Sequence, residues 1–102
     1  MDTETISRIE VLDTGELLLG LEGKGKSEYQ YVYREAAGVY WDPAKSGFKS
    51  TLMSEWSCSM WFSHIVSVVH SGLGLKLVLA KSVSWRNIPD QQRLEIEKTI
   101  VT

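Results

Sequence analysis

The sequence predicts an α+β domain in which an antiparallel sheet of about five strands carries one amphipathic helix on a face and a short C-terminal helix. Three observations predict this class. Short β-favouring segments separated by glycine-containing turns fill the first half of the chain, and a helical apolar stripe follows over residues 58–71. The chain of 102 residues is also long enough to form a core without disulfide or metal support. We therefore treat residues 1–102 as one domain.

Two strands are expected first. Ile6, Ile9 and Val11 with Leu12 indicate a strand that ends at an Asp-Thr-Gly turn over residues 13–15. Residues 16–22, ELLLGLE, form the next strand, and their near-continuous leucines favour a buried position in the sheet. Gly20 inside this run indicates a bulge or a close neighbour. Together with the strands that follow, the pattern predicts an antiparallel meander.

Residues 29–42, YQYVYREAAGVYWD, predict a β-hairpin around which the chain is organised. Three tyrosines alternate with other residues over 29–34, which places them on one face of a strand. Residues 35–38 fit a four-residue loop with Gly38 in a left-handed conformation, and residues 39–42 form the return strand before Pro43. The aromatic residues indicate either ordinary cross-strand packing or a ligand pocket between sheet and helix. The candidate ligand-binding residues are Tyr29, Tyr31, Tyr33, Tyr40 and Trp41.

A helix is predicted over residues 58–71, after a turn at 44–47 and a short strand at 48–52. Ser54 or Ser57 can cap its beginning, and Gly72 fits the left-handed position after its end. Seven residues fall on one apolar stripe that must pack on the sheet. They are Cys58, Trp61, Phe62, Ile65, Val66, Val68 and Val69.

The opposite face of this helix carries serine every four residues and has no charged residue between Glu55 and Lys76. Solvated helix faces normally carry Lys, Glu and Arg, and the centres of protein interfaces are depleted of charge. We therefore hypothesise that a partner chain covers this face, most simply a second copy across a two-fold axis. A solvent-exposed face and a face covered by the chain's own C-terminal segment remain alternatives. The candidate interface residues are Ser59, Met60, Ser63, His64, Ser67, His70 and Ser71.

The last part of the chain predicts a strand and a helix. Residues 75–80, LKLVLA, read as a strand, and Trp85 is expected to be packed. Pro89 and Asp90 indicate the beginning of a helix that continues to about Thr99. The alternation of apolar residues in this segment leaves a strand as the alternative over residues 90–101.

Composition restricts the classes of partner. A formal charge of −2 and a pI near 5.6 argue against nucleic acid. The acidic N-terminus lacks the pattern of a signal peptide, and the uncharged run of residues 56–75 contains too many serines and histidines for a membrane span. We expect a cytoplasmic protein without a membrane partner.

No motif in the sequence indicates a cofactor or a catalytic centre. Cys58 is the single cysteine, which excludes an internal disulfide and any multi-thiolate metal site. It lies on the apolar stripe, so we expect it to be buried and inert, and the spacing of His64 and His70 does not suit a shared metal ion. Glu35 and Asp42 flank the predicted hairpin and could serve as an acid–base pair only if a cleft held them together. We therefore predict neither a metal nor a catalytic residue.

The aromatic segment at residues 29–42, followed by Phe48 and by SEWSCSMWFSHI at residues 54–65, resembles small uncharacterised bacterial proteins that include ones encoded on mobile integron gene cassettes. The similarity covers residues 6–89. It implies a bacterial cytoplasmic accessory protein of α+β fold and carries over no functional residue. It is also compatible with a small partner-binding protein such as an immunity factor against a toxin.

The sequence thus favours a non-catalytic interaction or accessory protein that forms a homodimer or binds another protein. The alternative is a small-molecule-binding domain that uses the aromatic residues given above. An enzyme that uses Glu35 or Asp42 is a third possibility.

Overall fold

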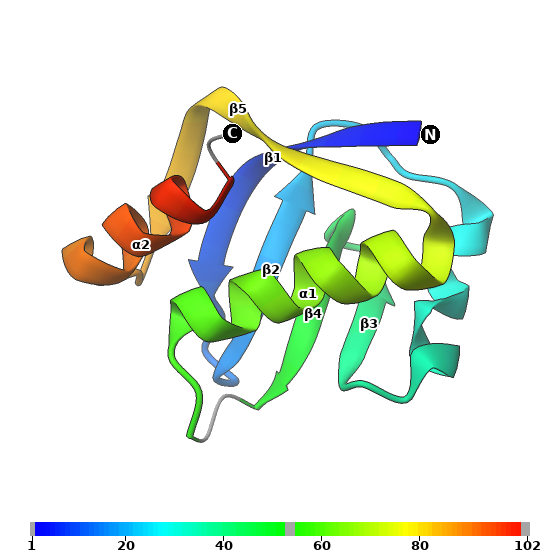
Figure 1. The fold of residues 1–102 in the computed structure, drawn as a ribbon, viewed down its shortest axis with the longest axis horizontal. Helices are drawn as coiled ribbons and strands as arrows, with labels where there is room; N and C mark the ends of the chain where they lie inside the picture. Colours follow the sequence, from blue (N-terminus) through cyan, green and yellow to red (C-terminus); the bar gives the residue numbers. More distant parts are fainter. Residues whose placement is uncertain (1, 53–54, 101–102) are drawn as a thin grey trace.

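All helices of the structure lie on one face of a five-stranded sheet (Figure 1). The computed structural model describes residues 2–52 and 55–100. The prediction of an α+β protein with a mostly antiparallel five-stranded sheet, a packed helix and a C-terminal helix is confirmed. In chain order the elements are β1 (Asp2–Val11), β2 (Glu16–Leu21), the 3₁₀ helix η1 (Ser27–Glu35), β3 (Val39–Asp42), β4 (Gly47–Leu52), α1 (Cys58–Leu73), β5 (Leu75–Arg86) and α2 (Asp90–Ile100).

The strands are ordered β3-β4-β2-β1-β5 across the sheet. Three neighbouring pairs are antiparallel, whereas β1 and β5 are parallel. The predicted meander is therefore wrong, because β2 pairs with β4 and not with the next segment of the chain. A parallel neighbour requires a crossover connection, and α1 supplies it by crossing the sheet between β4 and β5.

Residues 27–35 form a 3₁₀ helix, so the predicted strand over residues 29–34 is wrong. In a 3₁₀ helix, residues three apart lie above one another, and here Tyr29 and Val32 are the two buried residues. The Tyr29 ring packs against Trp41 and Phe48, with ring centroids 5.3 and 5.5 Å apart. Burial of this pair overrides the alternation that favours a strand. Gly38 does adopt the predicted left-handed conformation, with φ of 76°.

The core lies between the sheet and α1. One row of residues in register runs across the sheet from β3 to β5 and faces the helices: Trp41, Phe48, Leu19, Ile9 and Trp85. On α1, Phe62, Ile65 and Val69 are fully buried against this face. Trp85 is partly buried against the core, as predicted.

The ends of α1 are defined by local capping. Ser57 is the N-cap and accepts a hydrogen bond from the Met60 N–H at 3.3 Å, which confirms one of the two predicted caps. The other, Ser54, lies outside the described residues. The helix runs to Leu73 and Gly74 takes the left-handed position with φ of 65°, two residues beyond the predicted Gly72. The C-terminal segment is the helix α2, which excludes the strand alternative for its described residues.

Candidate functional site

The outer face of α1 is the surface that the sequence singles out as an interface. Five of the seven candidate interface residues are exposed there. Met60 is the largest, with half of its surface exposed. We use the name outer face for Met60, Ser63, Ser67, His70 and Ser71.

The sixth candidate, Ser59, is covered by the chain itself. Its backbone N–H donates to Gln92 Oε1 at 3.0 Å, and its hydroxyl donates to Glu95 Oε2 at 2.7 Å. Both partners belong to α2, which lies beside the N-terminal part of α1 (Figure 1). The alternative of coverage by the C-terminal segment therefore holds at Ser59, while the outer face stays uncovered by the described residues.

The seventh candidate, His64, belongs to an aromatic cluster at the N-terminal end of α1. The rings of Trp56, Trp61 and His64 pack in tilted and edge-to-face arrangements, with centroids 4.9 to 5.5 Å apart. His64 Nε2 donates to the Ala37 carbonyl oxygen at 2.8 Å. Trp56 remains 41% exposed. The exposed edge of the cluster, together with Met60, borders a shallow hollow of about 390 Å³ that also reaches Glu95 of α2. A half-exposed aromatic cluster thus adjoins the outer face.

The structure does not gather the five candidate ligand-binding residues into one pocket. Tyr29 and Trp41 meet in the core, whereas Tyr31 and Tyr33 point outward from η1 and are 42% and 53% exposed. Arg34 lies over the Tyr31 ring, 4.4 Å from its centroid. Tyr40 pairs with Lys49 on the sheet face that carries no helix. The pocket hypothesis required the tyrosines to share one face of a strand. Residues 27–35 form a 3₁₀ helix instead, so this shared face does not exist.

The Tyr29 hydroxyl donates a 2.6 Å hydrogen bond to Glu4 Oε2 and thereby links η1 to β1. Burial raises the pKa of the Tyr29 phenol above its ordinary value, and the Glu4 carboxylate raises it further. Tyr29 therefore acts as a neutral hydrogen-bond donor in the folded protein. This contact has a structural role.

The groups considered for catalysis lie apart. Cys58 is buried in the core, and burial raises the pKa of its thiol, which disfavours the reactive thiolate. Glu35 lies against Gly72 on the helical side, whereas Asp42 accepts hydrogen bonds from Lys45 and Lys49 at one end of the sheet. Within residues 2–52 and 55–100, no three His, Cys, Asp or Glu side chains are placed to hold a metal ion. The geometry assigns no catalytic group.

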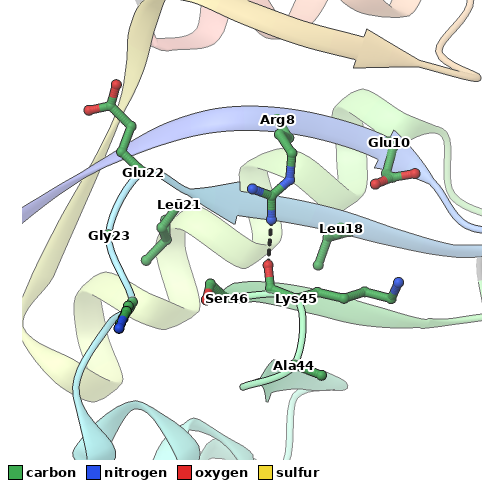
Figure 2. Close-up of a pocket in the computed structure, with 10 residues that line it drawn as sticks. Arg8, Glu10, Leu18, Leu21, Glu22, Gly23, Ala44, Lys45 and Ser46 are labelled. Carbon is green, nitrogen blue, oxygen red and sulfur yellow. Dashed lines mark hydrogen bonds between the residues drawn. The ribbon is translucent and has the colours of Figure 1, made fainter.

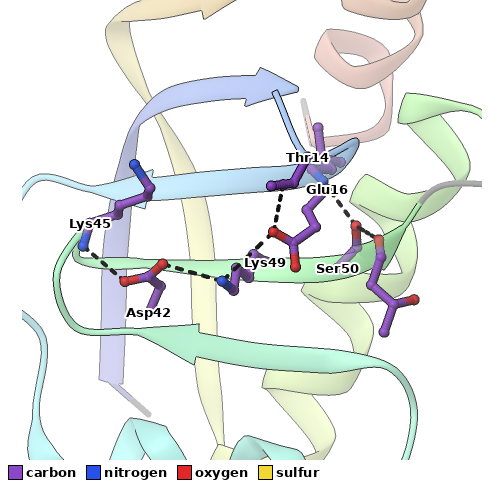
Figure 3. A network of polar contacts seen from close by, with 8 residues as sticks. Thr14, Glu16, Asp42, Lys45, Lys49 and Ser50 are labelled. Carbon is purple, nitrogen blue, oxygen red and sulfur yellow. Dashed lines mark hydrogen bonds and ion pairs between the residues drawn. The ribbon is translucent and has the colours of Figure 1, made fainter. Parts of the chain in front are cut away.

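The sheet face that carries no helix is a second polar surface, and we call it the open face. On it Lys49 bridges two carboxylates, at 3.8 Å from Glu16 and 3.3 Å from Asp42 (Figure 3). Thr14 donates to Glu16, and the Lys45 N–H donates to Asp42. Sequence reasoning did not predict this network, because the residues come from different strands and meet only through the strand register.

Arg8 and Glu10 on the open face were also missed. Figure 2 shows the Arg8 side chain crossing β2 to donate a hydrogen bond to the Lys45 carbonyl oxygen. Arg8 passes over Gly20, where an ideal Cβ would lie 2.6 Å from Cζ of Arg8. Gly20 thus has the close neighbour that its position in the strand predicts. The sequence offered no signal for which side chain that neighbour would be.

Among the described helices, none is both long and apolar enough to cross a membrane.

Comparisons with known proteins identify one family. The model of the family described as integron cassette protein Hfx_Cass5 matches residues 19–83, more than half of the chain. A solved structure, described as integron cassette protein Hfx_Cass5 from the mobile metagenome of the North West Arm sewage outfall, is 31% identical. The match covers 100% of this chain and 99% of that chain, with a TM-score of 0.44. Comparison with curated proteins finds no match.

Proposed function

The chain belongs to the Hfx_Cass5 integron cassette protein family, and we propose that it is a cytoplasmic accessory protein that acts by binding protein, without catalysis, and that it assembles as a homodimer through the outer face of α1. One observation carries the proposal: an uncharged and largely uncovered helix face adjoins a half-exposed aromatic cluster. Charge depletion with exposed Met and Trp is the composition found at the centres of protein interfaces.

The absence of charge favours a second copy as the partner. A two-fold axis brings the same residues of both copies together, so a charged face would be opposed by its own charges. The outer face carries serines, methionine and a histidine, and therefore meets no fixed like charge in a copy of itself. The small side chains of Ser63, Ser67 and Ser71 also allow a second helix to approach closely.

The size of α1 limits how much of the interface the helix alone can supply. Its 16 residues span about 24 Å, and a strip of helix roughly 10 Å wide then covers about 240 Å². A stable interface buries about 800 Å² on each partner, so the contact must extend beyond the helix. Trp56 lies just before α1 and is exposed, and Leu94 is a 59% exposed apolar residue of α2, which contacts α1. We include both in the proposed interface.

The solution mass tests the proposal directly. Light scattering coupled to size exclusion, over a hundredfold range of concentration, should give a dimer for the native chain and a folded monomer for the double variant Ser63→Glu with Ser67→Glu, because charges of one sign repel across a two-fold axis. The same pair of charges placed on β5 as Ser82→Glu with Ser84→Glu is the matched control, because both serines are exposed there. This control should remain a dimer.

A native chain that is monomeric at every concentration would overturn the homodimer. A dimer that persists in the outer-face variant would move the interface elsewhere. Circular dichroism of each variant shows whether a change in mass reflects loss of the interface or loss of the fold.

A further inference from the structure

The open face contains a hollow of about 430 Å³ that the proposed interface does not use (Figure 2). Leu18 and Leu21 contribute its apolar lining, and charged side chains surround them. Arg8, Lys24 and Lys45 supply three cations, and Glu10 supplies a carboxylate. Glu22 also borders the hollow, but its carboxylate points away from the Arg8 guanidinium in Figure 2. The size is at the lower end of the range for small-molecule sites.

The fold fixes the Arg8 guanidinium in place. It lies over Gly20, which leaves room for it because glycine has no side chain, and Nη2 donates to the Lys45 carbonyl oxygen. Within the described part of the chain, Nε and Nη1 of Arg8 have no hydrogen-bond acceptor and no carboxylate within 4.0 Å. Nη2 also has a second N–H. A planar guanidinium held in this way can bind a carboxylate through two parallel hydrogen bonds, one from Nη2 and one from a neighbouring nitrogen, at little entropic cost.

Glu10 supplies the opposite charge beside it. Arg8 and Glu10 are two residues apart on β1 and share the open face, so their Cα atoms are about 6.6 Å apart. They nevertheless form no ion pair, because Arg8 is drawn across β2 to the Lys45 carbonyl. The fold therefore places Arg8 and Glu10 as neighbours on the open face without an ion pair between them.

We propose that this hollow binds a small zwitterion of the free amino-acid class. Arg8 receives the ligand's carboxylate, and Glu10 receives its ammonium group. Lys24 and Lys45 add further positive charge to the lining. No part of this proposal depends on the outer face of α1.

The test is an NMR titration of the ¹⁵N-labelled chain with each of the twenty amino acids up to 50 mM. At least one should give saturable shifts at β1 and β2. Its N-acetyl derivative lacks the ammonium charge and its amide lacks the carboxylate, and each should bind at least tenfold more weakly. Absence of any saturable shift would overturn the proposal. If either derivative binds as tightly as the zwitterion, the hollow recognises a single charge and not a zwitterion, and the proposal is equally overturned.

Two variants assign the roles. Glu10→Gln should weaken binding of the zwitterion at least tenfold and leave binding of the N-acetyl derivative unchanged. Arg8→Lys should weaken binding of both ligands. Glu28→Gln removes the same charge from the exposed surface of η1 and should change nothing. Arg8→Lys also alters the contact with the Lys45 carbonyl, so Glu10→Gln is the deciding variant if that chain unfolds. Binding that survives Glu10→Gln without loss would refute the proposed role of Glu10.

Discussion

The hydroxyl of Tyr29 on η1 and the carboxylate of Glu4 on β1 are 2.6 Å apart, and the phenol donates its proton to this contact. The bond connects the segment that covers the edge of the sheet near β3 with a strand near the other edge. Because its carboxylate partner is charged, the bond belongs to the stronger class of hydrogen bonds.

Tyr29→Phe should lower the free energy of unfolding by about 1.5–3 kcal/mol near neutral pH, since the ring packing remains and the charge-assisted bond is lost. The pH dependence gives a second readout. The folded state raises the pKa of Tyr29 above its ordinary 10.0, so it holds the phenol proton more tightly than the unfolded chain does. Its contribution is present below pH 10 and is lost as the pH rises above that value.

Urea unfolding between pH 8 and 11.5 should therefore show that the free energy of unfolding falls less steeply with rising pH for Tyr29→Phe than for the native chain. The free energy of unfolding of Tyr29→Phe should still fall somewhat at alkaline pH, because the hydrogen bond to Asp2 raises the pKa of Lys26 as well. Identical alkaline slopes for the two proteins would contradict the assigned role of Tyr29.

Ser50 replaces a backbone bond in the sheet. The register of β2 against β4 shifts between Glu16 and Leu18, and at this point the Leu17 N–H donates to Ser50 Oγ at 2.9 Å. Ser50 is fully buried. Ser50→Ala leaves that N–H without its acceptor and should cost about 1–3 kcal/mol in denaturant unfolding. Ser84→Ala on exposed β5 is the control and should stay within about 0.5 kcal/mol. Equal costs for the two would contradict this assignment.

Gly20 and Gly47 are neighbours on the open face but resist substitution for different reasons. The nearest neighbours of a Cβ on Gly20 would be atoms of the Arg8 side chain, whereas a Cβ on Gly47 would lie 2.6 Å from the Leu19 carbonyl oxygen. Both alanine variants should be destabilised, by about 1–3 kcal/mol. In an Arg8→Ala background, Gly20→Ala should become neutral or stabilising, since alanine is favoured over glycine in strands.

Gly47→Ala should stay costly in that background, because its obstacle is backbone. A double-mutant cycle measured by urea unfolding separates the two cases. Full additivity between Arg8→Ala and Gly20→Ala would show that the guanidinium does not occupy the space above Gly20.

The Cys58 thiol should react slowly in the folded protein. Burial raises the pKa of the thiol above its ordinary 9.0, and the side chain lies in the core. Modification by a disulfide reagent at pH 8 should therefore be at least a hundredfold slower than in urea, since the thiolate is the reacting species. Reaction at the unfolded rate in native buffer would place Cys58 at the surface.

Local signals in the sequence predicted the elements whose structure is determined locally. The stripe from Cys58 to Val69 and the cap at Ser57 identified α1, because side-chain spacing and the cap hydrogen bond are properties of one segment. The same reasoning failed at Tyr29–Tyr33, where spacings of two and three residues were both present. Contact of Tyr29 with Trp41 and Phe48 decides between them, and that contact is tertiary.

The candidate surfaces were predictable to a similar extent. The missing charge on the outer face can be read directly from the sequence, but coverage of Ser59 depends on where α2 lies. The hollow beside Arg8 and Glu10 could not be anticipated. It requires the register that places Gly20 beside Arg8 and the loop that brings the Lys45 carbonyl within reach.

The parallel pairing of β1 with β5 also constrains how the chain folds during synthesis. Asp2 pairs with Leu75 and Glu10 with Arg86, so most of the chain lies between the partners. On the ribosome β1 can pair early with β2, but its other edge remains unpaired until β5 emerges. Contacts between such distant segments slow folding, and an exposed strand edge is prone to aggregate meanwhile. Expression yield should therefore depend on how quickly β5 is delivered to that edge.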